Sequence, residues 1–145
     1  MIVLDTTVLL YAKGADHPLR EPCRRLIEAI RVGRVRATTT PEVVQEFVHV
    51  RARRRDRSEA VGLGHAYAGL LAPLTVVDEQ VLRAGLEIFH DIPRLGAFDA
   101  VLAAAALAID AQALVTADVA FSDLGALLAV APGTPAFDEL LADGQ

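Results

Sequence analysis

Four carboxylates in this sequence stand beside apolar segments, where a charged side chain needs a partner or a specific task. Asp5 and Asp118 come after short apolar runs, IVL and ALVT, which are typical of buried strands. Asp99 opens the segment FDAVLAAAALAI, which is apolar on all sides, and Glu46 lies on the flank of an apolar stripe in PEVVQEFVHV. Asp5 and Asp118 could instead be simple helix N-caps. Asp99 could simply be a first-turn residue whose negative charge the helix dipole stabilises. Glu46 could be a solvated surface residue.

If these acids converge, their chemistry predicts a metal site. Carboxylates packed together repel one another and cannot all stay ionised without a cation. Oxygen-only ligands favour Mg²⁺ or Mn²⁺ over zinc, and such ions promote phosphodiester hydrolysis. Residues 95–145, which include two of the four acids, contain seven acids and no Lys or Arg. Two of the acids therefore have no basic residue nearby in the sequence.

The elements that must position these acids alternate between strands and helices. Apolar and β-branched runs predict strands at residues 2–4, 35–39, 74–77, 113–116 and 127–131. Helical spacing, caps and stop signals predict helices at residues 6–12, 19–32, 41–53, 58–71, 79–89 and 98–109, with a short turn or helix at 118–123. This alternation predicts an α/β fold with a mostly parallel sheet. Ligands of such sheets bind beyond the carboxyl ends of the strands, where Asp5 and Asp118 are expected to lie.

Basic side chains concentrate in residues 20–57, although the whole chain has a net charge of -5. This segment contains 11 of the 14 Lys and Arg residues and five acids, so its own net charge is +6. A basic region on an acidic protein fits a polyanionic partner held near the carboxylates. A solvated helix face explains the same pattern equally well.

The totals of the sequence exclude several classes of protein. Its 145 residues suit one domain, expected over residues 1–145, and a hydrophobic content of 53% excludes a disordered chain. No apolar run approaches the roughly 18 residues of a membrane span, and no basic segment precedes the first apolar run as it does in a signal peptide. Cys23 is the only cysteine and the four histidines lack metal spacing, so no disulfide framework or Cys-based zinc site is expected. These features predict a cytoplasmic protein.

Four strings of the sequence, in a fixed order, carry a family resemblance. They are IVLDTTVLLYA, TTTPEVVQEFVHV, LGAFDAVLAAAA and LVTADVAF, and together they span residues 2–121. The sequence resembles PIN-domain ribonucleases, and specifically the VapC toxins of type II (VapBC) toxin–antitoxin systems. The resemblance implies a PIN-like three-layer α/β fold with a central, mostly parallel sheet of four to five strands. It also implies a metal-dependent endoribonuclease for tRNA or rRNA that forms a homodimer and is neutralised by a VapB-type antitoxin, docked against the helices at 19–32 and 41–71.

The resemblance also assigns expected roles to individual residues. It makes Asp5, Glu46, Asp99 and Asp118 the acidic quartet around Mg²⁺, with Mn²⁺ as a substitute. Thr6 and Thr116 match the family's hydroxyl positions and would orient the carboxylates or a bound water. The arginines of the string RARRRDR could contact RNA, contact the antitoxin or solvate a helix end; the RNA candidates are Arg51, Arg53, Arg54 and Arg55. Many relatives have a further acid where this sequence has Ala120, which bears on a second metal ion rather than on the site itself.

Two other classes of protein place an Asp after a first strand or share the expected fold. An aspartyl-phosphate phosphatase needs a second Asp where this sequence has Thr7, and a phosphoacceptor domain needs a late lysine, whereas the only lysine is Lys13. A catalytically silent PIN fold that only binds RNA or protein is the remaining alternative. The presence of all four acids argues against it, because a silent relative is expected to have lost at least one.

Overall fold

Four short strands form a parallel sheet at the centre of the chain. The computed structural model describes residues 1–142, so the end of the expected domain 1–145, with Asp143, lies outside the described residues. The strands are β1 (Ile2–Leu4), β2 (Ala37–Thr38), β3 (Ala113–Val115) and β4 (Ala129–Val130), in the order β2-β1-β3-β4. All three pairings are parallel, and Ile2 lies between Ala37 and Ala113. The carboxyl ends of the four strands therefore share one edge of the sheet.

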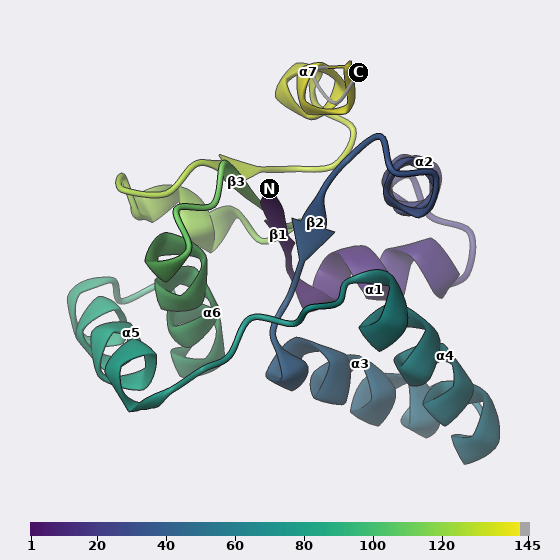
Figure 1. Ribbon diagram of the computed structural model, residues 1–145, viewed down its shortest axis with the longest axis horizontal. Coiled ribbons are helices and arrows are strands. Elements are labelled where there is room, and N and C mark those ends of the chain that lie inside the picture. The colour runs from purple at the N-terminus through teal and green to yellow at the C-terminus, as the bar shows by residue number, and fades with distance from the viewer. Residues whose placement is uncertain (143–145) are drawn as a thin grey trace.

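Helices lie on both sides of this sheet (Figure 1). On one side are α1 (Thr6–Lys13), α2 (Arg20–Arg31), α3 (Pro41–Arg54) and α4 (Arg57–Leu70). On the other side are α5 (Glu79–Asp91) and α6 (Ala97–Ala108). A short 3₁₀ helix, η1 (Val119–Asp123), follows β3, and α7 (Pro135–Ala142) follows β4. The predicted three-layer α/β fold with a parallel sheet is confirmed.

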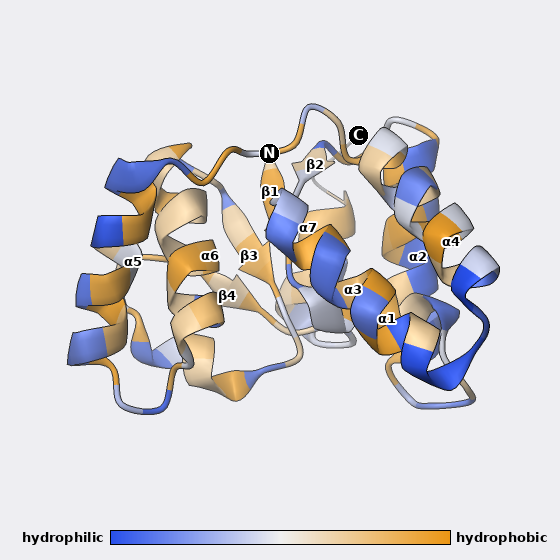
Figure 2. Ribbon diagram, turned by 90° about the horizontal axis from the view of Figure 1, so that it is seen from below, coloured by the Kyte–Doolittle hydropathy of each residue, from blue (hydrophilic) through white to orange (hydrophobic). Residues whose placement is uncertain are grey.

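Local sequence explains why the elements that border the site form where they do. β1 and β3 read IVL and ALV and are buried throughout, because strands between two helix layers have no solvent face. α3 begins at the predicted cap: Thr40 accepts the Val43 N–H at 3.3 Å, and Pro41 takes the first helical position. α6 is rich in alanine and apolar apart from Asp99 in its first turn, and Figure 2 shows it mainly in orange and pale orange.

Two glycines allow neighbouring helices to approach closely. A Cβ on Gly85 of α5 would lie 2.7 Å from Val101 Cα of α6, which is closer than packed atoms approach. A Cβ on Gly64 of α4 would collide with the side chain of Val48 in α3. Gly64 lowers the helix propensity of α4, but the close packing of α4 against α3 requires it.

Two elements differ from the sequence prediction. The predicted strand at 74–77 is wrong: within the described chain, the only backbone hydrogen bond of this segment runs from Thr75 N–H to the Thr39 carbonyl at 2.9 Å. The segment is an irregular connection, and its Val76 is 71% exposed. No pattern predicted α7, which buries Phe137 and Leu140. The strands expected at 35–39 and 127–131 are shorter than predicted.

None of the helices within residues 1–142 is long and apolar enough to cross a membrane.

Candidate active site

Asp5 lies within a set of hydrogen bonds at the carboxyl end of β1. Its Oδ1 accepts the Thr6 backbone N–H at 2.7 Å, which makes Asp5 the N-cap of α1. Its Oδ2 accepts two hydroxyl donors, Thr7 at 2.9 Å and Thr116 at 2.7 Å. The residue is only 4% exposed. A helix cap needs one of these bonds, so the two at Oδ2 fix the carboxylate more firmly than capping alone requires.

Thr116 and Thr7 also join the end of β3 to the end of β1. Thr116 Oγ1 donates to Asp5 and accepts the backbone N–H of Asp118 at 3.0 Å. Thr7 Oγ1 accepts the backbone N–H of Ala117 at 3.1 Å. Asp118 itself is exposed and caps η1 through its Oδ1. The two acids that follow strands therefore lie at the same sheet edge and are connected through Thr116.

The other two acids reach this edge from helices. Glu46 lies on α3, and the Thr6 hydroxyl donates to its Oε2 at 2.7 Å. Asp99 is the third residue of α6 and is partly buried. Asp5, Glu46 and Asp99 line one pocket of about 40 Å³, whose other walls are Thr40, Glu42, Val43, Val77, Phe98, Val101 and Leu102. Among the described residues that line the pocket there is no Lys or Arg to balance the acids.

Burial and mutual repulsion raise the pKa values of two of these acids. Burial is the main cause that raises the pKa of Asp99 to about 6, and the charges of Asp5, Asp118 and Glu46 act in the same direction. Burial also raises the pKa of Asp5, although its hydrogen bonds oppose this effect. Because all three other acids act on Asp99, the four carboxylates form one electrostatic group.

The four acids are neighbours but do not form a finished ligand set. Over residues 1–142, no three Asp, Glu, His or Cys side chains are arranged so that they could hold a metal ion as they stand. Three of the carboxylates accept hydrogen bonds from the protein instead: Asp5 from three donors, Glu46 from Thr6, and Asp118 from the backbone of η1. Like charges without a counter-ion repel one another, so an ion would have to draw these side chains inwards.

The sequence prediction missed two residues of this region. Its motifs give Thr7 no role, yet the Thr7 hydroxyl donates to Asp5 and holds the backbone after β3. Glu42 lines the same pocket as Glu46. The available signal for Glu42 was its spacing, since residues four apart on a helix lie on the same face. No comparable local signal existed for Thr7, because its second partner lies 110 residues away.

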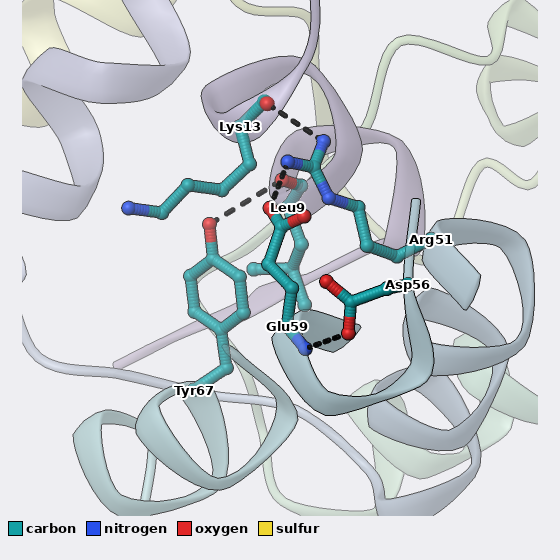
Figure 3. A network of polar contacts seen from close by, with 6 residues as sticks. All are labelled: Leu9, Lys13, Arg51, Asp56, Glu59 and Tyr67. Carbon is teal, nitrogen blue, oxygen red and sulfur yellow. Dashed lines mark hydrogen bonds and ion pairs between the residues drawn. The ribbon is translucent and has the colours of Figure 1, made fainter. Parts of the chain in front are cut away.

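The basic run at the end of α3 contains one internal arginine and several exposed ones. The side chain of Arg51 is 13% exposed. Its guanidinium donates to the Lys13 carbonyl at 2.9 Å and pairs with Glu59, which fastens the end of α1 to α3 and α4 (Figure 3). Of the four arginines predicted to contact RNA, Arg51 is therefore already engaged within the protein, whereas the others are exposed: Arg53, Arg54 and Arg55.

Comparisons with known proteins identify the family to which this sheet and its site belong. Residues 2–127 match the model of the PIN domain. The chain is 54% identical to Ribonuclease VapC7 of Mycobacterium tuberculosis over 144 residues, which cover 99% of each protein. It is 30% identical over 118 residues to VapC ribonuclease Mb1869c of Mycobacterium bovis and to Ribonuclease VapC13 of M. tuberculosis, covering 68% of this chain and 90% of each relative. The chain belongs to the PIN-domain family, and the predicted resemblance to VapC proteins is confirmed.

Proposed function

We propose that this chain is a VapC-type toxin, an endoribonuclease that hydrolyses phosphodiester bonds in tRNA or rRNA. The observation that carries the proposal is the convergence of Asp5, Glu46 and Asp99 on one pocket without a basic side chain among its walls. A module that only binds RNA gains nothing from such a cluster, because uncompensated acids repel phosphates and are costly to bury. The 54% identity to a relative named as a ribonuclease supports the same activity.

The donor chemistry of the pocket fits Mg²⁺, with Mn²⁺ as a substitute. Its polar groups are carboxylate and hydroxyl oxygens, which hard divalent cations prefer. We assign the ligand positions to Asp5, Glu46, Asp99 and Asp118. When bound, such an ion supplies charge stabilisation to the scissile phosphate and lowers the pKa of a nearby water. The raised pKa of Asp99 supports this assignment, because an added positive charge would relieve the repulsion that raises it.

The threonines of the site would keep the carboxylates in place. Thr116 and Thr7 hold one oxygen of Asp5 from two sides, which leaves that carboxylate little rotational freedom. Thr6 restrains Glu46 through a single hydrogen bond at 2.7 Å. We therefore assign orienting roles to Thr6 and Thr116, and extend the same role to Thr7.

The first experiment is cleavage of total cellular RNA by the purified chain, with Mg²⁺, with Mn²⁺ and with chelator. Discrete fragments that require the ion and disappear in Asp5→Asn are the expected result, and mapping their ends identifies the substrate. Asp110→Asn is the matched control: Asp110 is exposed, has a φ of 49° that Asn tolerates, and lies beyond the far end of α6. Fragments that persist in chelator or in Asp5→Asn would contradict the proposal.

A homodimer is proposed through the apolar face of α5 and the start of α6. The exposed large apolar side chains of these helices are Leu82, Leu86, Phe89 and Phe98, and Phe98 is 83% exposed. Leu82, Leu86 and Phe98 line a hollow of about 470 Å³. Apolar surface of this kind marks protein interfaces. Leu86→Arg should convert a dimer to a monomer in sedimentation, and an unchanged dimer would place the interface elsewhere.

A VapB-type antitoxin is the proposed protein partner, and the cytoplasm is the proposed place of action. The VapC relationship supports this partner. We retain the expected dock along α2, α3 and α4, because these helices form much of the surface beside α1. Addition of the cognate antitoxin should suppress RNA cleavage. Full cleavage in the presence of bound antitoxin would contradict neutralisation at this site.

A further inference from the structure

We propose that an arginine-lined cleft between α3 and α4 binds the phosphodiester backbone of the RNA substrate beside the cleaved bond. This inference rests on the proposed ribonuclease function. The cleft has a volume of about 500 Å³ and is lined by Val48, His49, Ala52, Arg53, Arg57 and Val61. It contains two guanidinium groups and no acid among its walls, so its charge complements a polyanion.

The charges of the two cleft arginines are not neutralised by ion pairs within the described residues. Arg53 and Arg57 are exposed, and neither makes an ion pair within residues 1–142. Their neighbour Arg51 differs, since Glu59 and the Lys13 carbonyl engage it. Two like charges that share a cleft repel each other unless an anion lies between them. A phosphate group is the anion for which guanidinium geometry is best suited.

The cleft continues the helix face that carries an acid of the candidate active site. Glu46, His49 and Arg53 lie at positions i, i+3 and i+7 of α3, which places them along one side of the helix. At about 1.5 Å per residue, Arg53 lies about 10 Å along the axis from Glu46. Successive phosphates of one strand lie only several ångströms apart, so phosphates close to the one at Glu46 can reach the position of Arg53. A strand whose scissile phosphate lies at Glu46 would therefore bring neighbouring phosphates to Arg53 and Arg57.

The composition of the cleft favours RNA over an acidic protein segment. Its apolar walls come from Val48, Ala52 and Val61, and its charged side chains are two arginines with no acid among the walls. The charge changes sign along a single helix, from Glu42 and Glu46 near its start to Arg53 near its end. A substrate that must bind a metal at one point and be held by its backbone on either side requires this change of sign.

The test measures RNA binding without cleavage, using the full chain with Asp5→Asn and a fluorescent single-stranded oligouridylate as probe. Backbone contacts do not depend on sequence, so this probe suffices before the natural substrate is known. Arg53→Gln and Arg57→Gln should each weaken binding by about threefold to tenfold and reduce the slope of log K against log salt by about 0.7. Arg53→Lys should keep the salt slope, because a lysine still neutralises a phosphate. If Asp5→Asn impairs folding, the unaltered chain in chelator replaces it.

The matched control is Arg24→Gln on α2, which removes an arginine that is also exposed and makes no ion pair within residues 1–142. Arg24→Gln should leave the affinity and the slope unchanged. Equal RNA affinity in the cleft variants and their parent would overturn the proposal. The same preparations are tested for binding to poly-glutamate, and variants that lose this binding but keep RNA binding would assign the cleft to an acidic protein instead. In the chain with Asp5 intact, the cleft variants should raise KM and leave kcat unchanged. If that chain binds RNA through Arg53 and Arg57 but cuts no RNA, the proposed activity fails and the cleft assignment stands.

Discussion

Asp5 and Asp99 line the same pocket but are held in opposite ways. Asp5 ends a strand and accepts three hydrogen bonds, whereas Asp99 begins a helix and accepts none within the described residues. At Asp5 these bonds oppose the effect of burial on the pKa. At Asp99 burial and three neighbouring charges act together and raise the pKa to about 6. The sheet edge thus fixes the position of one charge, while the helix adds a second charge that requires a cation or a proton.

The comparison predicts that removing the two charges has equal effects on activity and opposite effects on stability. Asp5→Asn and Asp99→Asn should each reduce RNA cleavage by at least about 100-fold, since both positions are proposed metal ligands. Asp5→Asn should lower the free energy of unfolding by about 1–3 kcal/mol, because its amide group would face hydroxyl donors. Asp99→Asn should raise the melting temperature of the metal-free chain at pH 7, because it removes repulsion. Cleavage assays and thermal melts of the same preparations measure both effects, and destabilisation by Asp99→Asn would contradict the electrostatic account.

A smaller effect is expected where the two strand ends are joined. Thr116→Val removes the donor to Asp5 and the acceptor for the Asp118 N–H. Cleavage should fall by about 10–100-fold, the usual range for groups that orient a metal ligand. Thr116→Ser keeps the hydroxyl and should retain most of the activity. Equal activity in Thr116→Val and the unaltered chain would show that the strand end positions Asp5 without this bond.

The same contrast explains which parts of the site the sequence could predict. Asp5 and Asp118 were predicted at one sheet edge because short apolar runs mark β1 and β3, and parallel strands end together. Glu46 and Asp99 were harder, since a helix pattern gives the face of a residue but not what lies opposite it. Their arrival at one pocket depends on how α3 and α6 pack on the sheet, which no local pattern records.

The errors in the fold prediction have a similar cause. Residues 74–77 have the composition of a strand, yet they form a single backbone hydrogen bond to Thr39 instead of pairing with a strand. Composition does not show whether a neighbouring strand is free to pair. The helix that buries Phe137 was missed since its short apolar pattern lies beyond the last expected strand. Hydrogen-bond partners such as Thr7 and Ala117 are set by the assembled sheet edge and were beyond prediction.

The stability of the metal-free chain should depend on pH through Asp99. Its pKa is raised from 3.8 to about 6 in the folded chain, so between these values the folded state binds more protons than the unfolded state. Stability from this group is therefore greatest at low pH and is lost as pH rises through the interval from 3.8 to about 6. Urea unfolding at several pH values should show this loss in the unaltered chain and a smaller loss in Asp99→Asn. Added Mg²⁺ should oppose it most strongly above pH 6, where the acids are ionised; a Mg²⁺ effect that is greater at pH 5 would contradict the assignment.

The smallest effect is expected at Thr6, which restrains a carboxylate on a helix by one hydrogen bond. Glu46 is exposed, so water can replace the lost donor in Thr6→Val, and the buried valine has nearly the shape of threonine. Unfolding free energy should change by no more than about 0.5 kcal/mol, and cleavage should fall less than about tenfold. Thr6→Ser, which keeps the hydroxyl, should cleave as the unaltered chain does. If Thr6→Val instead costs as much activity as Thr116→Val, the helix-borne acids are positioned as strictly as the strand-borne ones, and the proposed difference between the sheet edge and the helices does not hold.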